Sequence, residues 1–356
     1  MSKLRVAIIG QGRSGRDIHG FFFKGEMNTH YEVAAVVEAD EFRRNRALEE
    51  YPGCEVFADY TELFGRTDID LVVNASYSKM HYSITKDLMQ HGFNVLVEKP
   101  VGASYYECSD LIKTAKENHV VLAPFMQSNL APHAVSAFAA IENGKIGEPL
   151  QVSIRYNGFG RRWDWQTLQC EVAGGLFNTG PHPVGIALKF LDYADDAKVV
   201  YSKLGNGLTS GDGDDYAKLI LAAAGKPLVD VEVSSHDAYP QYNIKIQGTK
   251  GTYQCKLGEY KMKYIVDGEN PEQPVIRESL SDENGYPAYC GEKLITHEEE
   301  GKFEGTPWIE ATRDLYEELY YRITEGKDMT VTPDMAAKVV AVIETVHAQN
   351  PMPVKF

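Results

Sequence analysis

The stretch Gly10-Gln11-Gly12-Arg13-Ser14-Gly15 decides the fold of this chain. It follows an apolar run at residues 4–9, which we predict to be a strand, and it opens an amphipathic stretch at 14–24, which we predict to be a helix. In such a unit the first glycine allows a tight turn, the second lets a pyrophosphate approach the backbone, and the third lets the helix lie close to the strand. The free N–H groups at the start of the helix favour phosphate. All six residues are therefore predicted to bind a dinucleotide.

Beyond this loop, the first 125 residues alternate short apolar runs with amphipathic stretches. Such alternation predicts βαβ units and a doubly wound parallel sheet, which is the Rossmann architecture. The further predicted strands are 31–37, 71–74, 94–97 and 120–124, and the further predicted helices are 41–50, 60–64, 82–91 and 104–118.

The pattern changes after about residue 150, where predicted strands are separated by turns such as Gly248-Thr249-Lys250-Gly251. We expect an α+β domain with one mainly antiparallel sheet, followed by helices at 307–325 and 333–349. Thr306 and Thr332 each precede a proline and are expected to cap these helices. The predicted fold class is α/β, with a Rossmann domain over 1–125 and a second domain over 126–356 whose last helix returns to the first domain. The strands expected in the second domain are 150–156, 197–204, 216–223, 227–234, 243–247, 251–257 and 261–266.

Charge near the end of the second predicted strand bears on the choice of cofactor. Glu38 can accept both ribose hydroxyls of NAD and repels the 2′-phosphate of NADP, and Asp40 adds to that repulsion. Arg43 and Arg44 favour the opposite choice, because an arginine can hold a phosphate. We expect NAD rather than NADP, with Glu38 and Arg43 beside the cofactor.

The composition narrows the class of protein. The 356 residues carry a formal net charge of −15, whereas nucleic acids and anionic membranes attract a basic face. No apolar stretch is long enough to span a membrane, and the five scattered cysteines form no CxxC pair. The run Asp212, Asp214 and Asp215 is expected to be a solvated turn rather than a metal site. We expect a cytoplasmic enzyme without a bound metal that acts on a small molecule, with no nucleic-acid or membrane partner.

Three further motifs carry a family resemblance. They are Ser76-Tyr77-Ser78-Lys79-Met80-His81, Val97-Glu98-Lys99-Pro100 and Gly174-Gly175-Leu176-Phe177-Asn178-Thr179-Gly180-Pro181-His182. Together with the glycine-rich loop, they resemble the Gfo/Idh/MocA family of glucose–fructose oxidoreductases and inositol dehydrogenases over nearly the whole chain. The resemblance implies a Rossmann domain followed by an open-faced sheet that binds substrate and often mediates oligomers, so a homodimer or homotetramer is expected.

The resemblance also implies roles for single residues. Lys99 would lie beside the nicotinamide and hydrogen-bond the reacting oxygen, and His182 would be the general acid/base. The implied reaction is hydride transfer between a carbinol carbon of a sugar or cyclitol and nicotinamide C4. The residues expected near the cofactor from these motifs are Ser76, Tyr77, His81, Glu98 and Lys99.

These residue types suit that chemistry. Oxidation of a secondary alcohol creates a developing alkoxide that needs a cation, and its proton needs an acceptor with a pKa near neutrality. Lys99 supplies the cation and His182 the acceptor. Simpler interpretations stay open, because Lys99 could cap a strand end at the surface and His182 could be a buried structural histidine.

Two departures from the family pattern affect the proton path. The aspartate that commonly precedes the histidine by four residues is Asn178 here, and the one three residues after it is Gly185. Asn178 can orient the imidazole but supplies no charge, so His182 should be a weaker base. The usual proline after Ser76 is Tyr77, whose ring could protrude into the cleft.

The string Arg161-Arg162-Trp163-Asp164-Trp165-Gln166 mixes aromatic faces with charged and amide groups. That mixture suits a pyranose ring, which has an apolar C–H face and a rim of hydroxyls. Alternatively, the tryptophans belong to the core and the arginines pair with acids at a subunit interface. The residues expected to contact the substrate are Lys99, Arg161, Arg162, Trp163, Asp164, Asn178 and His182.

Three functions follow as hypotheses. The favoured one is an NAD-dependent oxidoreductase that acts on a secondary alcohol of a sugar, glycoside or cyclitol. An NAD-dependent glycosidase would oxidise C3 transiently, eliminate the glycosidic group and then reduce C3 again. A non-catalytic dinucleotide-binding regulator is disfavoured, because Lys99 and His182 are both present.

Overall fold

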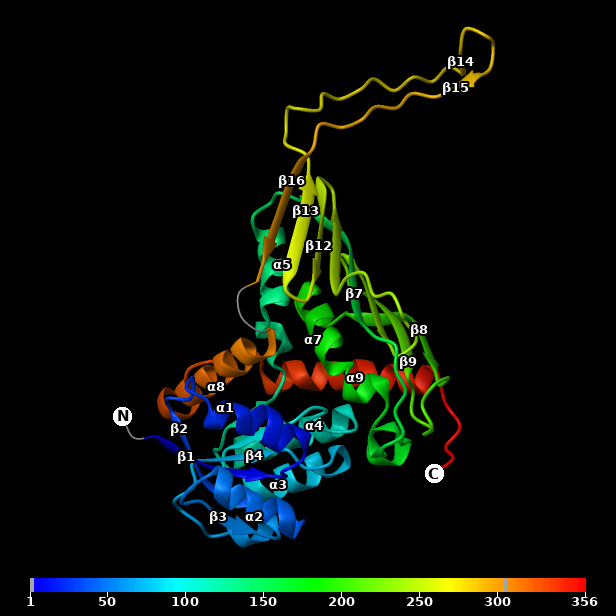
Figure 1. The fold of residues 1–356 in the computed structure, drawn as a ribbon. Helices are drawn as coiled ribbons and strands as arrows, with labels where there is room; N and C mark the ends of the chain where they lie inside the picture. Colours follow the sequence, from blue (N-terminus) through cyan, green and yellow to red (C-terminus); the bar gives the residue numbers. More distant parts are fainter. Residues whose placement is uncertain (1–2, 304–306) are drawn as a thin grey trace.

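The computed structural model describes residues 3–303 and 307–356 (Figure 1). The N-terminal domain forms a six-stranded sheet of order β3-β2-β1-β4-β5-β6 in which each pair of neighbours is parallel. Valine, isoleucine, leucine and alanine fill its strands, because a parallel sheet is buried on both faces. The three-residue strand β3 was not predicted, since so short a run shows no period. The strands are β1 (Leu4–Ile9), β2 (Tyr31–Val37), β3 (Glu55–Phe57), β4 (Leu71–Asn74), β5 (Val95–Val97) and β6 (Leu122–Pro124).

Helices cover both faces of this sheet, which is therefore doubly wound as predicted. One face lies against α1 (Gly20–Lys24), α2 (Glu41–Glu50) and α8 (Pro307–Glu325). The other lies against α3 (His81–Gln90) and α4 (Tyr105–Glu117), with α9 (Pro333–Gln349) beside α4. The strand order reverses between β1 and β4, and ligands of such sheets bind beyond the carboxyl ends of the strands at that point. The glycine-rich loop follows β1 and so lies at the ligand-binding edge.

The second domain is built on an eight-stranded sheet of order β16-β13-β12-β11-β7-β10-β9-β8. All its neighbours are antiparallel except β7 and β10. The predicted hairpin at Gly248–Gly251 joins β11 to β12. The strands are β7 (Pro149–Asn157), β8 (Lys198–Gly205), β9 (Tyr216–Ala222), β10 (Leu228–Ser234), β11 (Ile244–Gly248), β12 (Gly251–Lys256), β13 (Glu259–Tyr264) and β16 (His297–Lys302).

Helices cover one face of this second sheet. α5 (Pro132–Glu142), α7 (Pro181–Phe190) and α9 contact that face, where alternate side chains such as Ile154 and Val231 are buried. The other face carries polar side chains such as Lys218 and Arg155, and no helix of the described residues lies on it. The predicted open-faced, mainly antiparallel sheet is thus confirmed. The remaining short helices are α6 (Gly175–Asn178), η2 (Tyr60–Leu63), η3 (Ser78–Met80), η4 (Gln127–Leu130), η5 (Trp165–Thr167) and η6 (Gln169–Glu171).

The two C-terminal helices lie against the Rossmann domain. The Tyr316 ring of α8 stacks on Phe22 of α1 at 4.5 Å, and the Glu344 carboxylate of α9 accepts the Tyr105 backbone N–H of α4 at 3.0 Å. Thr332 caps α9 by accepting the Met335 N–H, whereas Thr306 lies outside the described residues. Between β13 and β16 the chain forms a long projecting arm that ends in β14 (Leu280–Ser281) and β15 (Pro287–Ala288) (Figure 1).

Candidate active site

The glycine-rich loop has the shape that a dinucleotide requires. Gly10 has φ +92°, and a Cβ added there would lie 2.5 Å from the Ala75 carbonyl oxygen. A Cβ on Gly15 would lie 1.9 Å from the Gly10 carbonyl oxygen, so only glycine allows this close approach. A Cβ on Gly12 would meet nothing within 4 Å, which leaves its backbone open to an incoming group. The loop therefore has the tight turn and the open backbone that binding of a pyrophosphate requires.

The helix that follows this loop differs from the single helix predicted at 14–24. Residues Arg13–His19 form a π-helix, in which the Gly20 N–H reaches the Gly15 carbonyl, and α1 begins only at Gly20. Arg13 is exposed at the start of this segment. Gln11 is buried, and its side-chain oxygen has no hydrogen-bond partner among the described residues.

Glu38 lies beside the glycine-rich loop at the end of β2. Its carboxylate accepts the Gln11 N–H at 2.7 Å and the Asp40 N–H at 3.0 Å. Arg44 is engaged elsewhere, because it donates to the backbone oxygens of Glu38 and Ala39. Arg43 keeps only a loose contact, 3.8 Å from the Glu38 carboxylate, and is half exposed. One acid and one available arginine thus flank the ribose end of the predicted cofactor site.

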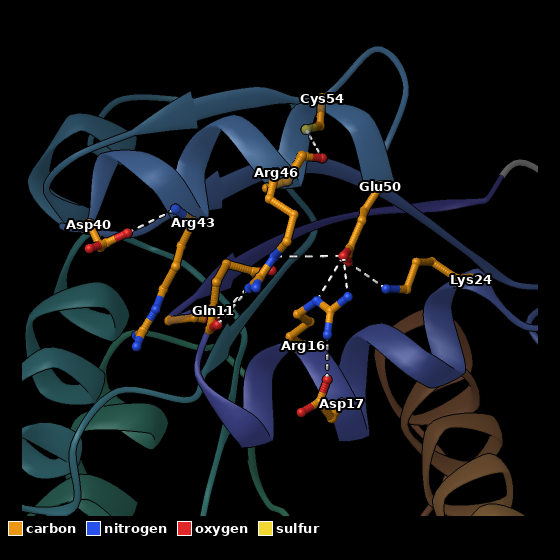
Figure 2. A network of polar contacts seen from close by, with 11 residues as sticks. Gln11, Arg16, Asp17, Lys24, Asp40, Arg43, Arg46, Glu50 and Cys54 are labelled. Atoms are coloured by element: carbon orange, nitrogen blue, oxygen red, sulfur yellow. Dashed lines mark hydrogen bonds and ion pairs between the residues drawn. The ribbon is translucent and has the colours of Figure 1, made fainter.

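A carboxylate that was not predicted supports the glycine-rich loop from behind (Figure 2). The Glu50 carboxylate of α2 forms ion pairs with Arg16 at 2.6 Å, Lys24 at 2.5 Å and Arg46 at 3.6 Å. Arg46 also donates a hydrogen bond to the Gln11 carbonyl oxygen. Burial alone would raise the pKa of Glu50, but Lys24 and Arg16 outweigh it and lower the pKa. This cluster is not visible in the sequence, because Arg16 and Lys24 lie 26 or more positions from Glu50 and only Arg46 is on the same helix.

Glu98 points into the protein beneath the loop. It is buried, accepts the Ser14 hydroxyl and the Lys99 backbone N–H, and lies 3.3 Å from Nε2 of the buried His19. Burial alone would raise the pKa of the Glu98 carboxyl, but His19, Lys99 and Ser14 hold it well below its usual range. Glu98 is therefore an anion that ties the glycine-rich loop to the backbone of Lys99.

The segment after β4 holds the next predicted cofactor residues. His81 is buried, and its Nδ1 and Nε2 lie 2.7 Å and 3.1 Å from the carbonyl oxygens of Pro100 and Ser76. Burial lowers the pKa of His81, against the opposing effect of the two carbonyl oxygens, and a neutral ring can donate to only one of them. The Ser76 hydroxyl donates to Asn74. Tyr77 is half exposed, and its ring meets the edge of Trp165 at 4.8 Å.

Lys99 reaches from the Rossmann domain to the second domain. It follows β5, and its ammonium donates to the Asn178 carbonyl oxygen of α6 at 2.8 Å. The Asn178 side chain turns away and donates to the Gln166 carbonyl at 2.6 Å. Asn178 is therefore near Lys99, but its amide serves the backbone of the 161–171 loop.

His182 lies near the start of α7, close enough to Lys99 for that charge to act on it. Burial lowers the pKa of the imidazole, and the Lys99 ammonium lowers it further, to about 3, against the opposing charge of Glu98. The ring centroid lies 5.6 Å from that of Trp308, and Nδ1 has no hydrogen-bond partner among the described residues. His182 is therefore neutral at pH 7, but it is a much weaker base than the near-neutral acceptor expected from the sequence.

Buried polar atoms that sequence reasoning missed follow β6. The side-chain oxygens of Gln127 and Ser128 are buried and have no hydrogen-bond partner among residues 3–303 and 307–356. Buried polar groups are normally paired, so these atoms are available to a ligand or to water. They follow the strand that neighbours β5, and so they lie at the same sheet edge as Lys99.

The predicted substrate residues divide into two groups. Arg162 forms a two-pronged pair with Asp164 at 2.9–3.1 Å and donates to Gln166, so these charges neutralise one another. Arg161 has no ion-pair partner in the described part of the chain, and Trp163 is 74% exposed. The loop is tied to the Rossmann domain by the Lys79–Glu171 ion pair at 2.6 Å. Arg161 and Trp163 are thus available to a ligand.

The expectation of a solvated turn at the aspartate run was wrong. Asp212, Asp214 and Asp215 are all buried and accept backbone N–H groups. Asp214 accepts the Leu176 N–H at 2.7 Å and so anchors α6, which carries Asn178. The burial of Asp212 and Asp214 could not be predicted, because the backbone N–H groups of Gln169 and Leu176 that they accept lie far away in the chain.

The described residues include neither a metal-binding cluster nor a membrane-spanning helix. No group of three or more histidine, cysteine or acidic side chains is arranged to hold a metal ion. No helix among them combines the length and apolar character needed to cross a bilayer.

A glycine-rich turn at the switch point of a doubly wound sheet, followed by an open-faced second sheet, defines a two-domain protein of the dinucleotide-binding class. The chain belongs to the Gfo/Idh/MocA family. Residues 4–125 match its oxidoreductase domain with an NAD-binding Rossmann fold, and residues 135–254 match its C-terminal domain.

Relatives of this chain have varied activities. The 2,7-anhydro-N-acetylneuraminate hydratase of Mediterraneibacter gnavus is 25% identical over 291 residues, which cover 80% of this chain and 75% of that protein. The NADP(+)-dependent scyllo-inositol 2-dehydrogenase of Bacillus subtilis is 22% identical over 358 residues, 96% of this chain and 92% of that one. Among solved structures, GenD2 from gentamicin A biosynthesis, in complex with NAD, matches with a TM-score of 0.75 and 22% identity over 98% of this chain and 94% of its own.

Proposed function

We propose that this protein transfers a hydride between a secondary alcohol of a sugar, glycoside or cyclitol and the nicotinamide of NAD, with Lys99 and His182 as catalytic residues. The observation that carries the proposal is the Lys99–Asn178 contact of 2.8 Å. It brings the lysine that follows the cofactor-binding sheet to the segment that leads into His182. This contact supports a role for Lys99 as the cation and His182 as the proton acceptor for one hydroxyl.

Each residue has a definite task in this proposal. NAD supplies a hydride acceptor at nicotinamide C4. The Lys99 ammonium exchanges the Asn178 carbonyl for the substrate oxygen and stabilises the negative charge that develops on it. His182, neutral at pH 7, accepts the hydroxyl proton. Because its pKa lies near 3, oxidation should not lose activity through His182 protonation anywhere above about pH 5.

We propose NAD as the preferred cofactor. Glu38 places a carboxylate where a ribose 2′-hydroxyl is recognised, and Arg44, which could have held a 2′-phosphate, is bonded to backbone. Arg43 is the opposing group, and the NADP(+) dependence of the Bacillus subtilis relative shows that both choices occur among similar chains.

We propose that the substrate is a small polyhydroxylated molecule bound between Lys99 and the 161–171 loop. The exposed Trp163 ring offers an apolar face for a sugar ring, and Arg161 offers an unpaired donor group in the described part of the chain. Arg162 and Asp164 would form the polar rim. The inositol dehydrogenase among the relatives is consistent with such a substrate.

A second candidate is the NAD-dependent glycosidase, in which oxidation is transient and no NADH accumulates. One observation favours it: a relative at 25% identity is named a hydratase, a reaction with no net oxidation. Both candidates use the same hydride step and the same lysine, and they differ in whether the reduced cofactor leaves or returns its hydride.

The test is NAD reduction across a panel of sugars, inositols and glycosides, with aglycone release followed in parallel. The primary proposal expects steady NADH formation with at least one member, and the second candidate expects aglycone release without net NADH. Lys99→Ala should lower kcat by about 10²–10³-fold while NAD still binds. Lys113→Ala, which changes an exposed lysine of α4, is the matched control and should leave both unchanged. Full activity of Lys99→Ala would remove this residue from the mechanism.

We further propose that the reaction takes place in the cytoplasm. All five cysteines are free, and two of them, Cys170 and Cys290, are exposed, which suits a reducing compartment.

A further inference from the structure

A cavity of about 230 Å³ lies where the end of α7 meets η4 and the beginning of α9. Asp192 and Thr330 at its lining are exposed, whereas Asn129 is 1% exposed, so the cavity leads from the surface inward. At about 30 Å³ for each water molecule, it has room for about seven waters or for one small organic molecule. The lining residues are Asn129, Lys189, Asp192, Tyr193, Thr330 and Met335.

Asn129 presents an unused acceptor in this cavity. Its side-chain Nδ2 donates to the Tyr193 hydroxyl at 3.1 Å, and that hydroxyl donates to the Gly185 carbonyl oxygen at 3.1 Å. The orientation of the Asn129 amide is thereby fixed, since the hydroxyl accepts from nitrogen and not from oxygen. The amide oxygen Oδ1 is buried and has no hydrogen-bond partner among the described residues. Buried polar groups are normally paired, so Oδ1 requires a donor from outside the chain.

Lys189 presents unused donors. Its ammonium lies 4.3 Å from the centre of the Phe138 ring and has no hydrogen bond or ion pair in the part of the chain that the structure describes. Burial lowers the pKa of Lys189, against the opposing charges of Glu142 and Glu318. An ammonium carries three donors, and the ring uses none of them in a hydrogen bond. Lys189 can therefore donate to a ligand.

The turn after α7 shapes the wall of the cavity. Asp192 and Tyr193 have φ +51° and +48°, the left-handed region that side chains other than glycine seldom adopt. Two such residues in succession are held by outside contacts, because Lys338 of α9 donates to the Tyr193 carbonyl at 2.5 Å. Strained backbone of this kind gathers at ligand sites. The turn adds the Tyr193 ring and the Asp192 carboxylate to the lining.

The charges around the cavity favour a neutral ligand. An anion would be repelled by Asp192, which pairs with Lys226, and by Glu318, which accepts the Thr330 N–H at 2.8 Å. A cation would be repelled by Lys189. A neutral hydroxyl can instead accept from an ammonium and donate to an amide oxygen.

We propose that this cavity is a second binding site for a neutral polyhydroxylated molecule of the size of a monosaccharide or cyclitol. One hydroxyl accepts from Lys189, another donates to Asn129 Oδ1, and the apolar face of the ring lies against Tyr193 and Met335. The site is distinct from the proposed hydride-transfer site, because Lys189 is seven residues, or about 10 Å of helix, beyond His182. The proposal concerns binding alone and does not depend on the proposed function.

The first test measures acetylation of single lysines in the intact protein by limiting acetic anhydride, followed by peptide mass spectrometry. The probes are methyl glucoside and myo-inositol, which have no free aldehyde and form no imine with a lysine. We expect half-protection of Lys189 at about 1–10 mM probe and acetylation about 10-fold slower at saturation. Lys116 is the matched control: it too is a lysine without an ion pair in the last turn of its helix, and its rate should not change.

Lys99 gives an independent signal in the same experiment, and so separates this proposal from the proposed function. Protection of Lys189 supports the second site whether or not Lys99 is protected. Protection of Lys99 alone would overturn the second site and leave the hydride-transfer proposal intact. Equal protection of Lys189 by methyl glucuronide, the anionic counterpart, would overturn the preference for a neutral ligand.

A variant tests the unused acceptor. Asn129→Ala should raise the probe concentration for half-protection of Lys189 by at least about 10-fold, because a ligand hydroxyl loses its buried partner. Asn350→Ala is the matched control, since that half-buried amide likewise donates to a hydroxyl, that of Ser202, at 2.8 Å, and it should leave the concentration unchanged. Met335→Trp fills the cavity from α9 without removing a polar group and should abolish protection. Full protection of Lys189 in either folded cavity variant, as judged from its melting curve, would overturn the proposal.

Discussion

The two sides of the candidate active site are built in different ways. The glycine-rich loop on the Rossmann side is fixed by backbone contacts so close that Gly10 and Gly15 cannot carry a side chain. The 161–171 loop on the opposite side is exposed and irregular, and its shape depends on distant groups such as Lys79 and Asp212. The glycine-rich loop thus offers a ligand the chain's own backbone, whereas the 161–171 loop offers side chains held in place by long-range contacts.

The largest effect is expected in the glycine-rich loop, where alanine substitutions of two glycines can be compared. Gly15→Ala places a methyl group 1.9 Å from the Gly10 carbonyl, so we expect a loss of about 2–4 kcal/mol in the free energy of unfolding and no measurable NAD binding. Gly12→Ala meets nothing within 4 Å at φ −75°. The free energy of unfolding of Gly12→Ala should lie within about 0.5 kcal/mol of that of the parent protein. The variant should nevertheless bind NAD about 10–100-fold more weakly, because its methyl group would occupy the space of the pyrophosphate.

Urea unfolding and calorimetric titration with NAD separate these outcomes. Equal destabilisation by both alanines would mean that Gly12 is not open to a ligand. Normal NAD affinity in Gly12→Ala would place the pyrophosphate elsewhere.

This contrast also explains how far the sequence could be interpreted. The spacing of Gly10, Gly12 and Gly15 could be interpreted from the sequence, because it is typical of one strand–turn–helix unit. The contact that requires Gly15, with the Gly10 carbonyl oxygen, lies within that unit. Asp214 could not be assigned in this way: it is buried because it accepts the N–H of Leu176, 38 positions away in the chain. A polar run with local spacing looks solvated unless its distant partners are known.

The same limit applied to single residues at the site. Lys99 and His182 were nominated by family resemblance, and the structure adds what spacing could not, namely that Lys99 contacts the Asn178 carbonyl while the Asn178 amide faces Gln166. Glu50 was missed, because two of its three cations, Arg16 and Lys24, come from a distant segment of the chain. Local backbone rules are visible in a sequence, and side-chain networks between segments are not.

A smaller effect is expected at Glu38, beside the glycine-rich loop, where a side chain and not the backbone would recognise the cofactor. Glu38→Gln removes the charge but keeps an acceptor for the Gln11 N–H. We expect the preference for NAD over NADP to fall by about 10–100-fold with kcat nearly unchanged, because Arg43 then faces a 2′-phosphate without an opposing carboxylate. Glu41→Gln, at the start of α2, is the matched control.

Initial rates with each dinucleotide, at saturating substrate, measure this preference. An unaltered preference in Glu38→Gln would show that the carboxylate does not face the ribose. A shift of the same size in Glu41→Gln would show that the change in net charge, and not the position of Glu38, causes the effect.

The smallest effect is expected on the exposed side, and it is the most specific. Trp163 is 74% exposed and makes no ring contact or hydrogen bond in the described part of the chain, so Trp163→Ala should leave the free energy of unfolding within about 0.5 kcal/mol. Stacking on a sugar ring is worth about 0.5–1.5 kcal/mol, which predicts a KM for the sugar raised by about 2–10-fold at constant kcat and constant NAD affinity. Trp165→Ala differs, because that ring touches Tyr77 across the mouth of the site and its loss should also lower the melting temperature. Since the parent protein gives Trp163 no contact to lose, any change in KM must come from the ligand, and an unchanged KM would mean that the sugar lies elsewhere.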